Sequence, residues 1–333
     1  MTLSAVVSLV KKSTTGRSLM AAGMRGLCAL SPRLATGLAA RLFLRPDRRR
    51  ARAPAPRGVQ GHRFEVVTPA GAVAAWDFGE GPTVLLAHGW SGSAADLDAL
   101  IAPLVALGFY VVAWDAPGHG QSPGASSSIP AMGQALLAVG ARVGPVHAVI
   151  AHSLGAAATT FALSRGLQAS RVALLAPAAQ LDRFPSSFAR ALGLAGRERE
   201  VAAAIERRVG LPMAAIEPVA LAPAFRAPVL IVHDPSDREV PYSQAEALAA
   251  AWPSAALLPA PGLGHLRLLR DAEVVRATVL HVAGPGGAAE RSREAAGGNP
   301  RESRGDRAPL EATTWTVGQG GETSRPSRPG TRP

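Results

Sequence analysis

Five polar or glycine-rich segments hold the serine, histidine and aspartate side chains with which this sequence could do chemistry. They are residues 88–92, 115–122, 151–155, 233–241 and 262–265. A serine hydroxyl is a poor nucleophile until a base takes its proton, and histidine is the side chain that most often serves as that base. These residue types could therefore support nucleophilic attack by an activated serine, provided that the fold brings them together.

Each of these segments follows a stretch whose residues predict a β-strand. Strands are predicted at 63–67, 73–78, 83–87, 109–114, 146–151, 171–175, 228–232 and 255–258. Helical patterns are found at 94–107, 129–139, 154–165, 243–250 and 271–281. This alternation predicts an α/β fold, with a mostly parallel sheet of eight strands and helices on both faces. Because ligands bind at the carboxyl ends of the strands in such sheets, the five segments should meet at one edge.

Taken together, the five segments resemble the α/β-hydrolase superfamily, and in particular its serine esterases and thioesterases. Ala151-His152-Ser153-Leu154-Gly155 is similar to the nucleophile elbow G-x-S-x-G, with alanine at the first glycine. Residues 88–90 resemble the H-G-x oxyanion segment, and residues 115–122 the loop D-x-x-G-H-G-x-S. Residues 233–241 resemble the acid loop, D-x-x-V-P after a late strand, and residues 264–265 the histidine loop. The order of serine, aspartate and histidine is that of the family. The resemblance covers about residues 61–283.

The resemblance implies a role for each residue of the site. Ser153 is expected to be the nucleophile, His265 the general base, and Asp237 the carboxylate that orients the histidine. The backbone amides of Trp90 and Leu154 are expected to hold the oxyanion. The residues expected to support this machinery are His88, Gly89 and His152.

Other carboxylates and histidines near these positions are open to different interpretations. Asp234 is the nearest competitor of Asp237, although its place just before Pro235 favours a turn-forming role. Asp182 is a weaker rival. Asp115 and His119 are interpreted as residues that hold their own loop.

A helical lid is predicted between the strands at 171–175 and 228–232. Residues 185–194, 197–209 and 213–219 have helical patterns, and hydrolases of this resemblance commonly carry a lid here, at about residues 178–222. Its apolar side chains imply a pocket, and hence a substrate, that is at least partly apolar.

The positive charge of the chain is concentrated at its start. Residues 1–60 contain twelve Lys and Arg and one acid, whereas residues 61–283 contain fifteen Arg and seventeen acids. A nearly neutral main body argues against a nucleic-acid-binding domain. Residues 46–60 resemble a linker in composition, and residues 284–333 contain so few large apolar residues that we predict a disordered tail.

Residues 32–44 have the spacing of an amphipathic helix with arginines alongside. Two interpretations stay open: peripheral contact of residues 1–45 with an anionic membrane, or packing of the helix on the body of the same chain. The acid-poor start also resembles an organellar transit peptide, which we rank lower. No stretch approaches the roughly 20 apolar residues that span a bilayer.

Neither a metal nor a cofactor is expected. Cys28 is the single cysteine, which excludes a disulfide framework and a multi-cysteine metal site. No group of histidines and acids has metal-ligand spacing, and neither G-x-G-x-x-G nor G-x-x-x-x-G-K-[ST] follows a strand.

The sequence therefore predicts a cytoplasmic serine hydrolase that cleaves an ester or thioester of a small, partly apolar molecule through an acyl-enzyme. Two alternatives stay open. The same three side chains could serve C–C bond hydrolysis or a lyase reaction, and the chain could be a non-catalytic, membrane-associated binding protein.

Overall fold

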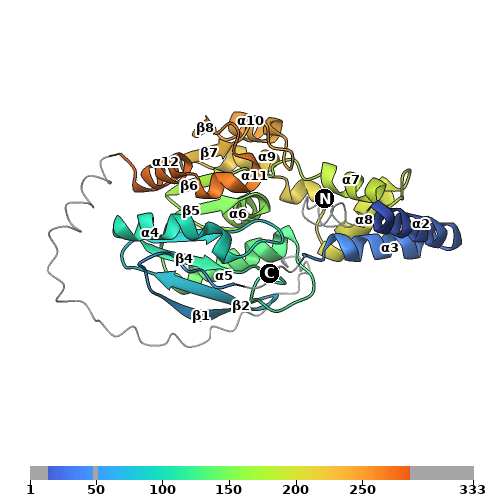
Figure 1. Cartoon of the computed structure of the whole chain (residues 1–333), viewed down its shortest axis with the longest axis horizontal. Coiled ribbons are helices and arrows are strands. Elements are labelled where there is room, and N and C mark those ends of the chain that lie inside the picture. The colour runs from blue at the N-terminus through green and yellow to red at the C-terminus, as the bar shows by residue number, and fades with distance from the viewer. Residues whose placement is uncertain (1–13, 48–51, 286–333) are drawn as a thin grey trace, which may run out of the picture. The chain divides into compact units, whose positions relative to one another are not determined.

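The computed structural model of the protein describes residues 14–47 and 52–285, which all belong to one compact unit, Met1–Gly297 (Figure 1). Residues 1–13, 48–51 and 286–333 lie outside this description. Apart from its first two residues, the tail predicted to be disordered is therefore outside the described residues. The domain boundaries expected near residues 60 and 283 stay predictions.

An eight-stranded sheet has the order β1-β2-β4-β3-β5-β6-β7-β8. The first two neighbouring pairs in this order are antiparallel and the other five are parallel, which confirms the predicted sheet. The strands are β1 (Gly61–Thr68), β2 (Gly71–Phe78), β3 (Thr83–Ala87), β4 (Tyr110–Trp114), β5 (Val146–His152), β6 (Arg171–Leu175), β7 (Val229–His233) and β8 (Ala255–Pro259).

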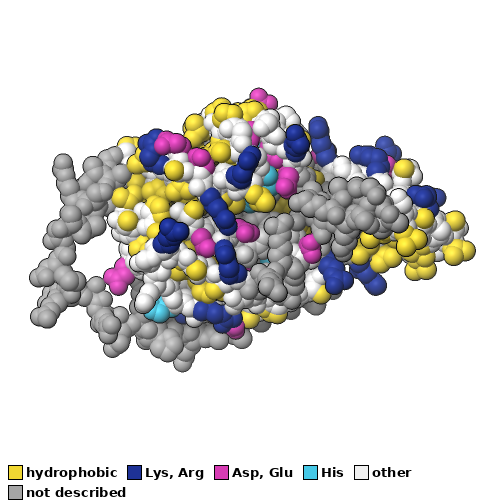
Figure 2. Space-filling view, viewed as in Figure 1, with side chains coloured by type: hydrophobic (Ala, Val, Ile, Leu, Met, Phe, Trp, Pro, Cys, Tyr) yellow, Lys and Arg dark blue, Asp and Glu magenta, His cyan; other side chains and the backbone are white. Residues whose placement is uncertain are grey.

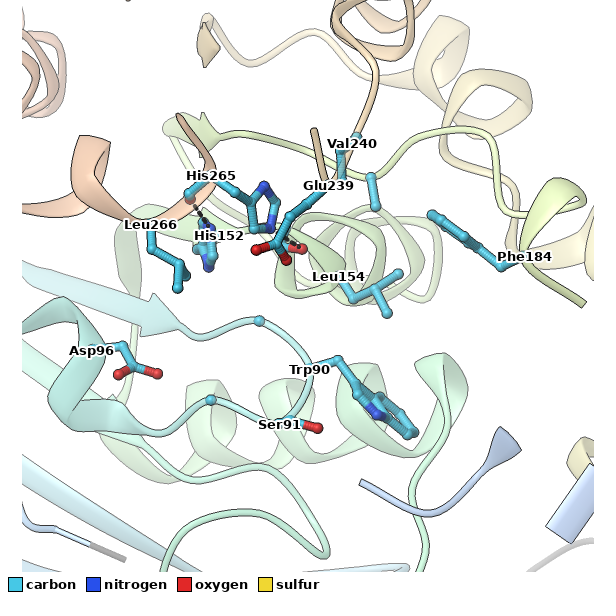
Figure 3. A pocket seen from close by; sticks show the side chains of 14 residues that line it. Trp90, Ser91, Asp96, His152, Leu154, Phe184, Glu239, Val240, His265 and Leu266 are labelled. Atoms are coloured by element: carbon cyan, nitrogen blue, oxygen red, sulfur yellow. Dashed lines mark hydrogen bonds between the residues drawn. The ribbon is translucent and has the colours of Figure 1, made fainter. Parts of the chain in front are cut away.

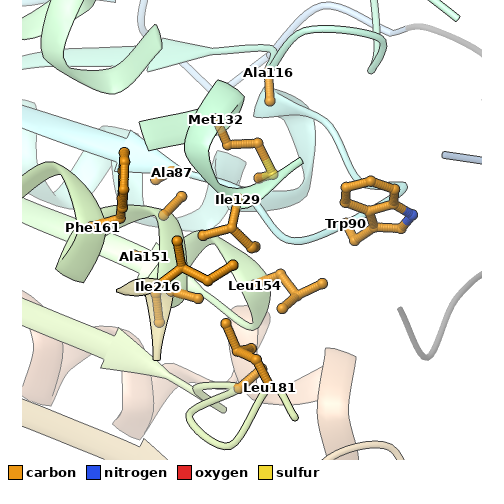
Figure 4. Packing of buried hydrophobic residues seen from close by; sticks show 14 of the residues in the cluster. Ala87, Trp90, Ala116, Ile129, Met132, Ala151, Leu154, Phe161, Leu181 and Ile216 are labelled. Carbon is orange, nitrogen blue, oxygen red and sulfur yellow. The ribbon is translucent and has the colours of Figure 1, made fainter. Parts of the chain in front are cut away.

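The central strands are buried on both faces. In β3, Leu85 and Ala87 belong to one apolar cluster and Val84 and Leu86 to another, because successive side chains of a strand point to opposite faces. Figure 4 shows part of the first cluster, where Ala87 of the sheet lies near Met132 of a covering helix. Burial on both faces explains why these strands are continuous apolar runs.

Helices cover both faces of the sheet, as predicted. The helices α4 (Asp98–Ala106) and α12 (Ala272–Ala283) lie on one face, and α5 (Ile129–Val143), α6 (Leu154–Ser164) and α10 (Tyr242–Ala251) lie on the other. Short helical turns complete this part of the chain: η1 (Ala94–Leu97), α11 (Gly264–Arg267) and η4 (Leu268–Arg270). The single helix predicted at 94–107 is divided into η1 and α4.

Five short helices follow β6, where the lid was predicted. They are α7 (Arg183–Ala191), α8 (Glu198–Val209), η2 (Met213–Ile216), α9 (Pro218–Leu221) and η3 (Ala222–Ala224). The prediction of one helix over residues 213–219 is wrong. Glu217 precedes Pro218 and is extended, with ψ 114°, because the proline ring disfavours a helical conformation in the preceding residue.

Two helices that precede the sheet pack against the lid (Figure 1). They are α2 (Thr14–Leu30), which the sequence analysis missed, and α3 (Pro32–Phe43), which it predicted. The Ser31 side chain caps α3 by accepting the Leu34 amide. Small buried side chains on α3, Ala35 and Ala39 among them, let it lie close to α8, and the Phe43 ring meets Phe188 of α7 edge-on at 5.4 Å. One face of α3 is therefore packed on the body of the chain.

This packing predicts different outcomes for the same substitution at two positions. Ala39→Leu adds volume at a fully buried position and should lower the free energy of unfolding by about 1–3 kcal/mol. Ala22→Leu on the exposed side of α2 should change it by less than about 0.5 kcal/mol. Urea unfolding of both variants measures the difference. Equal midpoints would show that α3 does not pack on α8 in solution.

Candidate active site

Ser153 occupies a sharp turn between β5 and α6. Its backbone has φ 52° and ψ −121°, a conformation that costs free energy for any residue except glycine. The turn is held by the Ser153 amide, which donates to the Leu175 carbonyl at 3.0 Å. A Cβ on Gly155 would lie 2.5 Å from the carbonyl oxygens of Ala87 and His88. The elbow sequence thus has its glycine where α6 passes close to the end of β3.

The side chains of Ser153, His265 and Asp237 form a continuous chain of hydrogen bonds. The Ser153 hydroxyl lies 3.0 Å from His265 Nε2, and His265 Nδ1 lies 2.7 Å from Asp237 Oδ2. All three residues are buried. In the neutral histidine, Nδ1 donates to the carboxylate, so Nε2 is free to accept the serine proton. The three side chains come from turns that follow β5, β7 and β8.

Asp237 is held as a carboxylate by several donors. Its Oδ1 accepts the amides of Glu239 at 2.6 Å and Val240 at 3.1 Å, and His233 Nε2 lies 3.3 Å from its Oδ2. Burial raises the pKa of Asp237, but the hydrogen bonds from His233 and His265 lower it more, so its pKa lies well below the usual range. Asp237 is therefore ionised at neutral pH.

His233 was not singled out in the sequence. It is fully buried, and its Nε2 also lies 3.0 Å from the Val240 carbonyl. Its position four residues before Asp237, at the end of the strand that leads into the acid loop, is the signal that could have identified it.

Asp234 has a separate task from Asp237. Its Oδ2 accepts the amide of Gly264, the residue before His265, and its Oδ1 accepts the Ser236 amide at 2.7 Å. Burial raises the pKa of Asp234, but these hydrogen bonds outweigh it and the net pKa is lowered. Asp234 thus ties the acid loop to the histidine loop. Asp182, the weaker rival, lies at the start of α7.

The two residues whose amides are expected to hold an oxyanion, Trp90 and Leu154, both line the cleft of Ser153. Leu154 is the first residue of α6, so its N–H has no acceptor within the helix. Trp90 belongs to the loop after β3 and lines the same cleft as Ser153 and Leu154. A Cβ on Gly89 would lie 3.0 Å from the Ser153 Cβ, so only glycine lets this loop approach the serine without displacement.

His88 and Asp115 fix the loop that carries Trp90. His88 Nδ1 donates to the Gly89 carbonyl at 2.6 Å, and its Nε2 accepts the Ala116 amide at 2.9 Å. Asp115 accepts the amides of Ala94 at 2.7 Å and Gln121 at 2.6 Å, and burial raises its pKa against the opposing effect of His88.

His119 packs beneath the same loop. Its ring meets the Trp90 ring edge-on at 5.1 Å, and its Nδ1 lies 3.0 Å from the Pro117 carbonyl. These contacts agree with a structural role for the loop at residues 115–122.

His152 supports the histidine loop from below. Its Nε2 donates to the carbonyl of His265 at 3.0 Å, and the two rings lie 4.7 Å apart (Figure 3). Burial and the neighbouring His265 lower the pKa of His152 well below 6.5, so it is neutral at pH 7.

Ser153 opens into a cleft with two chemically different sides. In Figure 3, His265, Glu239 and Leu266 lie on one side of Leu154, and Trp90 and Phe184 lie on the other. Asp96 also lines the cleft. Glu239 and Asp96 were not identified in the sequence, because nothing in their local pattern marks them as pocket residues. Within residues 14–47 and 52–285, no group of three His, Cys, Asp or Glu side chains is arranged to hold a metal ion.

The lowered pKa of His152 predicts how stability depends on pH. Unfolding raises this pKa to its ordinary value near 6.5, so below that pH the unfolded state binds a proton that the folded state excludes. Stability should therefore fall as the pH drops below 6.5, by at most about 1.4 kcal/mol per pH unit from this group. His281, whose pKa burial also lowers, contributes in the same direction.

His152→Gln keeps a donor for the His265 carbonyl but has no proton to bind. Urea unfolding between pH 5 and 7 should show a shallower loss of stability in this variant than in the wild type. His281→Gln serves as the comparison for a histidine outside the site. Parallel pH profiles for wild type and His152→Gln would contradict the assignment.

Comparisons with known proteins agree with this architecture. A family model described as serine aminopeptidase, S33, matches residues 81–206. Two human proteins, serine hydrolase-like protein and serine hydrolase-like protein 2, are 42% identical over 69 residues, which is 20% of this chain. The matched segment spans 34% of the first human protein and 22% of the second.

Solved structures resemble the chain over a larger part of its length. An esterase from Pyrococcus furiosus is 17% identical and superposes with a TM-score of 0.56, over 71% of this chain and 97% of the esterase. A hydrolase from Pseudomonas aeruginosa is 20% identical, with a TM-score of 0.53 over 67% of this chain and 99% of the other. The mostly parallel eight-stranded sheet and these structural likenesses show an α/β-hydrolase fold, and the family model matches the part of the chain that contains the elbow.

Proposed function

We propose that this protein is a serine hydrolase that cleaves an ester or thioester through an acyl-enzyme. The observation that carries the proposal is the unbroken chain of contacts from the Ser153 hydroxyl to His265 Nε2, at 3.0 Å, and from His265 Nδ1 to Asp237, at 2.7 Å. A buried carboxylate, an oriented imidazole and a serine in a strained turn together form an activated nucleophile.

The proposed reaction has two halves. His265 takes the Ser153 proton as the oxygen attacks the substrate carbonyl, and the amides of Trp90 and Leu154 stabilise the negative charge that develops on the carbonyl oxygen. The imidazolium then gives its proton to the leaving oxygen or sulfur, which departs and leaves the acyl group on Ser153. Water, deprotonated by His265, attacks this acyl-enzyme, and the released Ser153 oxygen recovers the proton.

The names of similar proteins support hydrolysis but do not select the bond. The structures from Pyrococcus furiosus and Exiguobacterium antarcticum are called esterases, whereas the family model is named for an aminopeptidase. The proposal favours esters and thioesters because a good leaving group needs less help than an amine. C–C bond hydrolysis and lyase chemistry can be distinguished from ester hydrolysis by one observation, because a reaction that uses the serine only as a base leaves no acylated Ser153.

The nucleophile assignment predicts the behaviour of three variants. The wild type should react with a fluorophosphonate probe at Ser153, and Ser153→Ala should not. Hydrolysis of p-nitrophenyl acetate should fall by roughly 10⁴-fold or more in Ser153→Ala and His265→Ala, and by about 10⁴-fold in Asp237→Asn. Asp182→Asn, at the start of α7 and outside the lining of the cleft, serves as the control and should retain most of the activity. Probe labelling that survives in Ser153→Ala would reject the proposal.

We also propose that α2 and α3 rest on an anionic lipid surface. Large apolar side chains remain exposed there: Leu19 at 75%, Leu30 at 88%, Leu34 at 65% and Leu38 at 39%. Figure 2 shows hydrophobic side chains gathered over these two helices. Arginines accompany them at positions 25, 33, 41 and 45, and no acid occurs before Asp47.

One face of α3 packs on the lid, and Leu34 and Leu38 of the same helix remain exposed to solvent. Packing on the chain and contact with a membrane are therefore compatible. Apolar side chains flanked by arginines suit the surface of an anionic membrane. No helix in residues 14–47 and 52–285 is long and apolar enough to cross the membrane. The cytoplasmic location expected from the sequence remains a prediction.

Vesicle co-sedimentation tests this contact with the full chain. Binding is expected to phosphatidylglycerol vesicles and not to phosphatidylcholine vesicles, and it should weaken as salt is raised. The double substitution Leu34→Ser and Leu38→Ser should reduce binding by at least about tenfold, because two apolar anchors are lost. Leu280→Ser on α12 is the matched control at an exposed leucine outside the patch. Equal binding by the double variant would end the proposal.

A further inference from the structure

A second cleft adjoins the Ser153 cleft and differs from it in chemistry. Trp90, Leu154 and Phe184 line both clefts, so the two lie side by side. The side chains that line the second cleft are apolar except for Ser128, whose hydroxyl is engaged in accepting the Ala131 amide at the start of α5. No charged side chain of the described residues lines it, whereas Asp96 and Glu239 line the first.

Besides Trp90 and Leu154, three separate parts of the chain build the second cleft. The lid contributes Met213 among others, and α5 contributes Ile129, which lies around the same space as Trp90 and Leu154 in Figure 4. The remaining wall is formed by Phe43 and Leu44, at the end of α3.

The wall from α3 is fixed on two sides. Phe43 packs edge-on against Phe188 of α7, with ring centroids 5.4 Å apart. The Leu44 carbonyl accepts the Ser127 amide at 2.8 Å, which places Leu44 beside the start of α5. The lid side is also held, because Glu217 accepts the Leu181 amide at 3.0 Å. The cleft is therefore a built part of the fold rather than a gap between loosely placed segments.

The position of His265 decides which part of a substrate faces this cleft. A leaving group must lie next to His265 Nε2 to receive its proton, and His265 lines only the first cleft, together with Glu239 and Leu266. The carbonyl carbon carries one other substituent, the acyl chain. With the leaving group on the histidine side, that chain points past Leu154 towards Trp90, Phe184 and the second cleft.

We infer that the second cleft binds the hydrocarbon chain of the acyl group, and that the N-terminal helix α3 determines substrate choice through Phe43 and Leu44. This inference rests on the proposed function, since it requires an acyl group on Ser153. The substrate class that fits is an ester or thioester of an apolar acid. Its leaving group is uncharged or cationic, because Asp96 and Glu239 lie in the first cleft and would repel an anionic one.

A chain-length series measures the cleft directly. For p-nitrophenyl esters, kcat/KM should rise about fourfold for each methylene that the cleft buries, up to the length at which the cleft is full. Leu44→Trp fills the cleft from the α3 side, and the ratio of kcat/KM for octanoate to that for acetate should fall at least tenfold. Met213→Trp fills it from the lid side and should act alike, which covers the case that one variant does not fold.

Leu42→Trp is the matched control. Leu42 lies on α3 two residues before Leu44 but does not line the cleft, so this variant should keep the wild-type ratio. Ser153-dependent hydrolysis with unchanged ratios in both filling variants would overturn the inference and leave the proposed function standing.

Calorimetric titration separates the cleft from turnover. Methyl decanoate should bind to Ser153→Ala protein, and binding should weaken at least tenfold when Leu44→Trp is added but stay unchanged when Leu42→Trp is added. If no ester is hydrolysed in a Ser153-dependent way, the proposed function fails, and this titration still decides whether the cleft takes a hydrocarbon chain. Equal binding in all three proteins would overturn the cleft assignment.

Discussion

The hydrogen bond from His265 Nδ1 to Asp237 joins two loops that leave the sheet at different strands, and the rest of the site is arranged around it. Two further contacts hold the histidine loop: Asp234 of the acid loop accepts the Gly264 amide, and His152 donates to the His265 carbonyl. Asp237 is surrounded by donors that keep its charge. A shift of either loop would break the contact with Asp237 and leave a carboxylate buried without its partner, which is costly. The imidazole is therefore held in one orientation relative to Ser153.

The elbow at Ser153 depends on close approach rather than on charge. Gly155 lets α6 begin against the end of β3, and Gly89 lets the neighbouring loop pass within reach of the serine. Ala151, where the family pattern has glycine, is fully buried in β5 and is accommodated there. The strain at Ser153 persists because the sheet and α6 determine the backbone on both sides of it.

Much of the fold could be predicted from the sequence because the central strands are short apolar runs that end in polar or glycine-rich turns. The order of Ser153, Asp237 and His265 located the three side chains that the structure brings into contact. The path of the lid was less predictable, since Pro218 interrupts a pattern that is otherwise helical. Asp96 and Glu239 are placed in the cleft by tertiary contacts. The contribution of Phe43 and Leu44 to the second cleft could not be predicted either, because residues far apart in sequence meet there without a local signature.

The residues around Ser153 and the residues of α3 that line the second cleft are constrained in different ways. The residues that surround Ser153 are constrained by hydrogen bonds and by backbone contacts that allow no extra atom. The side chains of Phe43 and Leu44 at the end of α3 are held by apolar packing, which tolerates exchange of one hydrophobic side chain for another of similar volume. Diversification among relatives of this protein can therefore proceed by remodelling a peripheral helix while the reactive centre stays intact.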